Sequence, residues 1–208
     1  MKTDFKLEWL AKCSKPSLGN ILLEYRYLVH RFTPWLGLLI SKTKYEKVRH
    51  LLLPNFIEES GDLNDNISHL QMLDNFILSS GIKNPDLYIP LKSTVVIEKW
   101  FYDLFDSGKT YEGLCVIGPS TEEISEQFLK PLLHSVRLLF SEKEIDYTYF
   151  DAHLSEMEVE HARCIEEAIR YMENIDKQLK SGKTHWVNEG LKKHIEFWNS
   201  MKDNFFTN

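Results

Sequence analysis

Apolar residues recur every three or four positions along nearly the whole chain, and this spacing most constrains its fold. The pattern is typical of helices that bury one face, whereas the alternating pattern of half-buried strands is scarce. The segment "ISHLQMLDNFILSS", for example, carries Leu70, Leu73, Phe76 and Ile77 on one face and ends at Gly81, a residue suited to a helix C-terminus. We therefore expect an all-α protein.

The same pattern divides the chain into about seven helices with short connections. The predicted helical segments are 17–42, 45–60, 67–80, 93–105, 110–118, 122–140, 146–180 and 185–205. Pro34 should kink or divide the first of these, because proline removes a backbone donor. Ser120 or Thr121 should cap the segment that begins at residue 122. The 208 residues, 43% of them hydrophobic, are enough for a single domain spanning 1–208.

Charge and cysteine content exclude several classes of protein. The net charge is −6 and lysines and arginines form no block, so we expect no nucleic-acid partner. The three cysteines are far apart in sequence, which argues against disulfides or a zinc knuckle and favours a cytoplasmic location. Without an apolar run of roughly 18 residues, the chain is expected not to interact with a membrane.

Glutamate and histidine residues lie beside apolar residues at three places. Glu59 and His69 flank a short predicted loop, and Glu122 or Glu123 begins a helix. The third place is "YFDAHLSEMEVEH", which contains His153, Glu158 and His161. Helical bundles build iron and manganese sites from such residues when these project inward. The competing interpretation is a solvated helix face, together with acids that favour a helix N-terminus.

The third cluster fits a metal only if its helix is irregular. On a regular helix His153 and His161 lie about 80° apart, whereas Glu158 lies about 140° from His153. One extra residue absorbed as a π-bulge between His153 and Glu158 would bring all three onto one line. We therefore expect a π-bulge if this segment binds metal.

The order of these motifs resembles that of a known superfamily over about residues 20–180. "PNFIEESGD" followed by "ISHLQMLDNFILSSGI" looks like the N-x-x-E-E-x-G…H signature of the heme-oxygenase-like diiron oxidases, which include the Chlamydia protein associating with death domains. "YFDAHLSEMEVEH" is similar to the later Y-F-x-x-H-x-x-x-D/E-x-x-H signature, with one extra residue before the acid. The resemblance implies a seven-helix, heme-oxygenase-like bundle.

The resemblance also implies a ligand set for two irons per chain. The implied ligands are Glu59, His69, Glu122 (or Glu123), His153, Glu158 and His161. Glu24 corresponds to an additional carboxylate in some members. Residue types alone leave manganese open as the metal. Tyr149, Asp151 or Asp65 are candidates for orienting the imidazoles.

The implied activity is an O2-dependent oxidation of a small amine- or carboxylate-bearing metabolite, of amino-acid or fatty-acid type. The reaction needs an external reductant, and the sequence leaves room for a homodimer. Three arginines are candidates for pairing with a substrate carboxylate: Arg26, Arg31 and Arg49. Four aromatic residues are candidates for lining the pocket: Tyr25, Tyr27, Trp35 and Phe150.

Two other functions remain open at this point. Thiaminase-type and pyrroloquinoline-quinone synthase relatives share the bundle and work without iron, and Cys115 or Cys164 would then be the candidate nucleophile. The other is a non-enzymatic interaction module that presents "EEAIRYMENIDKQLK" to a protein partner.

Overall fold

The described part of the chain is a bundle of α-helices, seen in a computed structural model that covers residues 5–61, 67–140, 145–154 and 157–206. Its α-helices are α1 (Lys15–Lys42), α2 (Glu46–Glu59), α3 (His69–Ser79), α4 (Lys92–Asp106), α5 (Thr110–Ile117), α6 (Ser125–Leu139), α7 (Thr148–His153), α8 (Met157–Ile175) and α9 (Lys183–Phe205). Four short 3-10 helices connect or precede them: η1 (Glu8–Lys12), η2 (Pro85–Leu87), η3 (Glu122–Ile124) and η4 (Leu179–Gly182). The expected all-α class is confirmed.

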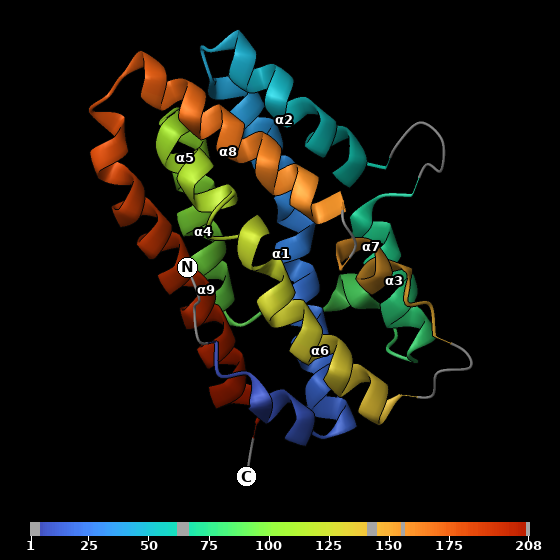
Figure 1. Ribbon diagram of the computed structural model, residues 1–208. Helices are drawn as coiled ribbons and strands as arrows, with labels where there is room; N and C mark the ends of the chain where they lie inside the picture. The colour runs from blue at the N-terminus through green and yellow to red at the C-terminus, as the bar shows by residue number, and fades with distance from the viewer. Residues whose placement is uncertain (1–4, 62–66, 141–144, 155–156, 207–208) are drawn as a thin grey trace.

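Helix α1 is the central element, and it packs against α2, α3, α4, α5, α6 and α9 (Figure 1). Its buried residues Leu18, Ile21, Leu22 and Leu28 recur at the spacing of one helical face. Pro34 does not divide α1, which continues from Lys15 to Lys42. Of the two expected effects, division of the helix is therefore wrong, and a kink stays a prediction; packing on several sides compensates for the backbone hydrogen bond that proline removes.

Two predicted helix ends near residue 60 and residue 80 are confirmed. Ser60 and Ser80 are the C-caps of α2 and α3, and the glycines that follow, Gly61 and Gly81, have φ of 92° and 87°. This left-handed conformation has little steric cost only for glycine. These stops place Glu59 at the end of α2 and His69, after the intervening connection, at the start of α3.

The start of the segment after α5 differs from the prediction. Thr121 is the N-cap residue of η3, but its side chain makes no capping hydrogen bond. The hydroxyls of Ser120 and Thr121 donate instead to the carbonyl of Val116 in α5, at 2.7 and 2.9 Å. The chain then forms the 3-10 turn η3, and α6 begins only at Ser125. Carbonyls in the last turn of α5 lack helical partners, so they compete for these hydroxyl groups.

The segment predicted as one long helix from residue 146 to 180 is broken. Helix α7 ends at His153, Leu154 is its C-cap, and α8 begins at Met157. Residues 155–156, where the proposed π-bulge would lie, are outside the described residues. Helix α7 packs on α3 and α6, whereas α8 packs on α2 and α5. Because their partner helices differ, the two segments do not form one continuous helix.

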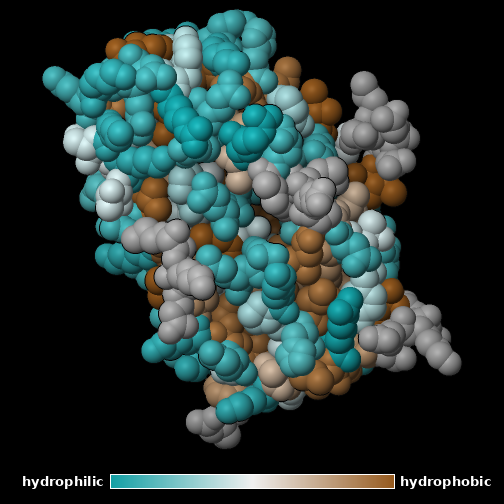
Figure 2. All heavy atoms as spheres, viewed as in Figure 1, coloured by the Kyte–Doolittle hydropathy of each residue, from teal (hydrophilic) through white to brown (hydrophobic). Residues whose placement is uncertain are grey.

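Figure 2 shows a face on which hydrophilic side chains dominate and hydrophobic ones reach the surface mainly in its lower half. Isolated exposed apolar residues of this kind are normal for a folded protein. Within the described residues, none of the helices combines the length and the apolarity that crossing a bilayer requires.

Candidate metal centre

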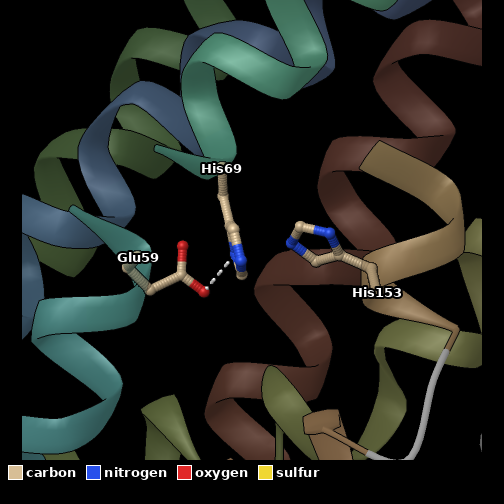
Figure 3. A group of neighbouring side chains, drawn as sticks. All are labelled: Glu59, His69 and His153. Atoms are coloured by element: carbon tan, nitrogen blue, oxygen red, sulfur yellow. Dashed lines mark ion pairs between the residues drawn. The ribbon is translucent and has the colours of Figure 1, made fainter. Parts of the chain in front are cut away.

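Three buried side chains from three helix ends converge inside the bundle. Glu59 is the last residue of α2, His69 the first of α3 and His153 the last of α7. One ligand atom of each lies within 4.8 Å of the others, and Figure 3 shows the side chains pointing toward one another. Two ligands on opposite sides of one ion lie about 4 Å apart, so this spacing suits a metal.

Glu59 and His69 form a buried ion pair. Nδ1 of His69 lies 2.8 Å from Oε1 of Glu59 without the alignment of a hydrogen bond. Burial alone would raise the pKa of Glu59, but the contact with His69 and the charge of its ring outweigh it and lower this pKa. Burial alone would lower the pKa of His69, but Glu59 outweighs it and raises this pKa. The close but misaligned contact fits two atoms that share a metal ion rather than a proton.

His153 is held in a defined tautomer by its own helix. Nδ1 donates to the backbone carbonyl of Tyr149, one turn earlier, at 2.8 Å. A carbonyl only accepts, so the proton is on Nδ1 and the lone pair is on Nε2. Burial, and next the charge of His69, lower the pKa of His153 to about 4, which keeps the ring neutral. A neutral imidazole with one nitrogen bonded to a carbonyl is the usual form of a metal-binding histidine.

His161 lies in α8 and pairs with Glu58 rather than with the group of three. Its Nε2 donates to Oε2 of Glu58 at 2.6 Å. Nδ1 of His161 and Oε1 of Glu58 are buried and lack a hydrogen-bond partner among the described residues. Glu58 precedes Glu59 on the last turn of α2. The first acid contacts His161 on α8, and the second contacts His69 on α3.

Glu122 lies in η3 and is buried, whereas Glu123 is exposed. The side-chain amide of Asn55 donates to Oε1 of Glu122 at 3.0 Å. The negative charge of Glu122 also contributes to the raised pKa of His69. Of the two glutamates left open by the sequence, Glu122 is thus the one that faces the interior.

Other predicted site residues lie outside the described residues or outside this cluster. The side chain of Glu158 and all of Asp65 are not described. Asp151, on α7, is exposed. Glu24 is fully buried, and its Oε1 accepts from the Tyr88 hydroxyl and the Leu91 amide, each at 2.7 Å. The structure therefore gives Glu24 a role in joining α1 to the segment before α4.

Buried polar atoms without partners test whether the residues fit a metal. In the described part of the chain these include His69 Nδ1, His161 Nδ1 and Glu58 Oε1. Such atoms are rare in folded proteins, because leaving them unpaired costs about 1–3 kcal/mol each. They are imidazole nitrogens and a carboxylate oxygen, the ligand types that suit iron, so the donor set fits the metal.

An apolar cavity of about 80 Å³ adjoins the cluster. Glu59, Glu122 and His153 contribute to its wall. Most of the remaining wall is aliphatic and aromatic, with Leu28, Phe32, Trp35, Phe101, Phe128 and Trp198 among its residues. A pocket of this kind beside convergent polar groups is the usual form of a small-molecule site.

Two of the four predicted aromatic residues, Tyr25 and Trp35, line this cavity. Tyr27 instead lies against the guanidinium of Arg31, and Phe150 is fully buried in the core. Tyr149, predicted to orient an imidazole, does so through its backbone, while its hydroxyl lies 2.7 Å from the Tyr25 hydroxyl.

The predicted arginines and cysteines are engaged elsewhere. Arg26 pairs with Asp74 and Asp86, Arg31 lies 3.8 Å from Glu98, and Arg49 pairs with Glu46. Burial raises the pKa of Cys115 to about 12 and also raises that of Cys164, so neither is primed as a thiolate nucleophile.

Sequence reasoning missed Glu58, Asn55 and His194. Asn55 and Glu58 are both part of the quoted N-x-x-E-E-x-G motif, so this motif could have identified them as site residues. His194 lies on α9, lines the cavity and belongs to no motif quoted above. The packing of α9 against α1, α4 and α5 brings it there.

Comparisons with known proteins bear on the fold and on the family. Residues 20–185 match the model of a family described as iron-containing redox enzymes. The fold is similar to a crystal structure, at 2.00 Å resolution, of a CADD-like protein of unknown function from Nostoc punctiforme, with a TM-score of 0.82, 18% identity, and coverage of 95% of this chain and 86% of that chain. A second structure of that protein, at 1.35 Å, gives a TM-score of 0.75, 17% identity, and coverage of 92% and 81%.

A search of the curated proteins found no match to the sequence. The family match nevertheless covers most of the chain, and the expected heme-oxygenase-like fold is confirmed. The chain belongs to the family of iron-containing redox enzymes.

Proposed function

We propose that the protein is a non-heme diiron enzyme that uses O2 to oxidise a small amine- or carboxylate-bearing metabolite, with electrons from an external reductant. The observation that carries this proposal is the buried group of Glu59, His69 and His153, which opens onto an apolar cavity. The family match supports iron and redox chemistry in general.

The proposed ligands divide into two neighbouring sets. Glu59, His69 and His153 would hold one ion, and His161, with Glu58 or Glu158, would hold the second. Glu122 lies in the cavity wall with Glu59 and His153, so its carboxylate would complete the ligand set. Two ferrous ions held by these residues would supply electrons for the reduction of O2.

The chain itself orients the proposed ligands and surrounds them with an apolar wall. The carbonyl of Tyr149 keeps the proton of His153 on Nδ1, so that Nε2 remains a ligand atom. The Asn55 amide donates to Glu122 and fixes the orientation of that carboxylate. The aromatic and aliphatic wall excludes water, which strengthens every charge interaction inside the cavity.

Metal analysis tests the proposal directly. The protein is produced in iron-supplemented medium, and bound iron and manganese are quantified in the wild type, His69→Ala, His153→Ala and the exposed-residue control His134→Ala. We expect about two irons per chain in the wild type and the control, and loss of metal in both buried-site variants. Manganese in place of iron would correct the identity of the metal.

An iron content that is near zero in the wild type, or unchanged in both site variants, would contradict the proposal. About one iron per chain would show a mononuclear centre instead. Consumption of O2 by the reduced, iron-loaded protein then tests the reaction.

A further inference from the structure

His194 is the one histidine of the cavity wall that the proposed metal centre does not use. It lies on α9, is 8% exposed, and packs between the rings of Phe101 and Phe128, with centroid distances of 5.5 and 6.1 Å. A polar ring at this position interrupts a mostly apolar wall. The cost of burying it calls for a hydrogen-bonding role.

The hydrogen bonds around Thr121 determine which nitrogen of His194 carries the proton. The Thr121 hydroxyl donates its only hydrogen to the carbonyl of Val116 at 2.9 Å. The 3.0 Å bond between Thr121 and His194 therefore has Nε2–H as its donor. The neutral ring then has its lone pair on Nδ1, which makes no hydrogen bond within the described part of the chain.

The surroundings keep this ring neutral. Burial lowers the pKa of His194 to about 4. His194 is thus a fixed hydrogen-bond acceptor, held in place by Thr121 and by the two phenylalanine rings.

We propose that His194 selects the substrate by accepting a hydrogen bond at Nδ1 from an N–H or O–H group of a compact, mainly apolar molecule. This inference rests on the proposed function in treating the cavity as the substrate site, and it narrows the substrate class. The amine or hydroxyl end faces His194. A carboxylate is disfavoured at this end, because it would meet the lone pair of Nδ1 without a donor.

The test uses pyrrole and furan as probes. Both are five-membered rings of nearly equal shape, but only pyrrole carries an N–H donor, and both are small enough for a cavity of about 80 Å³. Dissociation constants are measured by isothermal titration calorimetry on the full-length protein as purified. We expect pyrrole to bind roughly fivefold more tightly than furan, the effect of one net hydrogen bond.

Three variants assign this preference to His194. His194→Phe keeps an aromatic ring between Phe101 and Phe128 but removes the acceptor, so the preference should fall to about one while furan binding stays within about twofold. His194→Asn places an amide oxygen near the position of Nδ1 and should restore part of the preference. His185→Phe, the same substitution at an exposed position of the same helix, should behave as the wild type.

Equal binding of the two probes to the wild type, or a preference that survives His194→Phe, would overturn the inference. A wild-type protein that binds neither probe saturably would overturn it too. The result is separate from the iron analysis: a chain that prefers pyrrole but holds no metal contradicts the diiron proposal alone.

Discussion

Buried histidines have different roles in this protein, and their hydrogen-bond partners distinguish them. His153 donates to a backbone carbonyl, His161 donates to a carboxylate, and His194 donates to a threonine hydroxyl. These bonds leave Nε2 of His153 as an acceptor, whereas in His161 and His194 they leave Nδ1 as the acceptor. Sequence spacing identified the first two as candidates but could not show the tautomers, because the partners are backbone atoms or lie far away in the chain.

Acid should destabilise the protein through His194. Its pKa is about 4 in the folded chain and about 6.5 when unfolded, so below pH 6.5 the unfolded state binds more protons. This contribution to stability is complete above pH 6.5 and is lost as the pH falls toward 4. At pH 5 the loss is about 2 kcal/mol.

Urea denaturation at pH 7 and pH 5 measures this loss. His194→Phe should show a fall in unfolding free energy smaller than that of the wild type by about this amount. Equal pH dependence in the two proteins would show that His194 is protonated at no cost in the folded state.

Glu58 gives a second prediction for a single residue. Glu58→Gln removes the charge beside His161 and should weaken iron binding by about 10- to 100-fold, whether Glu58 binds the metal itself or only orients the imidazole. Glu123→Gln is the matched control, because Glu123 is a nearby but exposed glutamate. Iron affinity measured by competition with a chelator should fall only in the first variant. An equal effect in both would assign the change to net charge.

The helices themselves show why some boundaries were predictable and others were not. Gly61 and Gly81 mark true ends, because the left-handed conformation there is a local property of glycine. No glycine or proline in the sequence indicates the break after His153. This break arises because α7 and α8 pack on different partner helices. Likewise, Ser120 and Thr121 are residue types typical of helix N-caps, but their hydroxyls donate to the carbonyl of Val116 near the end of α5.

The contact between α5 and α9 depends on a glycine. A Cβ atom on Gly190 would lie 2.0 Å from Oγ of Ser120, which is itself bonded to Val116. Gly190→Ala should therefore destabilise the protein by about 1–3 kcal/mol, despite the better helix propensity of alanine. Gly182→Ala is the control, since its Cβ would meet only Trp186, at 3.8 Å. Urea denaturation that leaves Gly190→Ala as stable as Gly182→Ala would contradict this packing.

At the scale of the whole molecule, one contiguous core joins all the helices. Its buried residues range from Leu7 to Met201. The helical spacing of apolar residues predicted this arrangement, because burying every amphipathic face at once requires a bundle. The spacing could not show which residues share the cavity wall with Glu59, since His153 and His194 reach that wall through packing between helices distant in the sequence.

We expect the chain to unfold as a single domain. Urea unfolding should give coincident transitions when it is monitored by far-ultraviolet circular dichroism and by tryptophan fluorescence. The reason is that helices sharing one core unfold cooperatively. Two separated transitions would show that the chain contains two units, contrary to the single domain spanning 1–208.

The shortness of α7 has a consequence for how metal enters the protein. A helix of six residues is not stable alone, so the position of His153 depends on the helices against which α7 packs, α3, α6 and α8. Binding of metal should therefore stabilise α7. We expect that adding iron slows amide hydrogen exchange at residues 149–153 far more than in α1. If iron binds as proposed, its affinity depends partly on the free energy of ordering this segment, and mutations that loosen α7 without changing a ligand should lower that affinity.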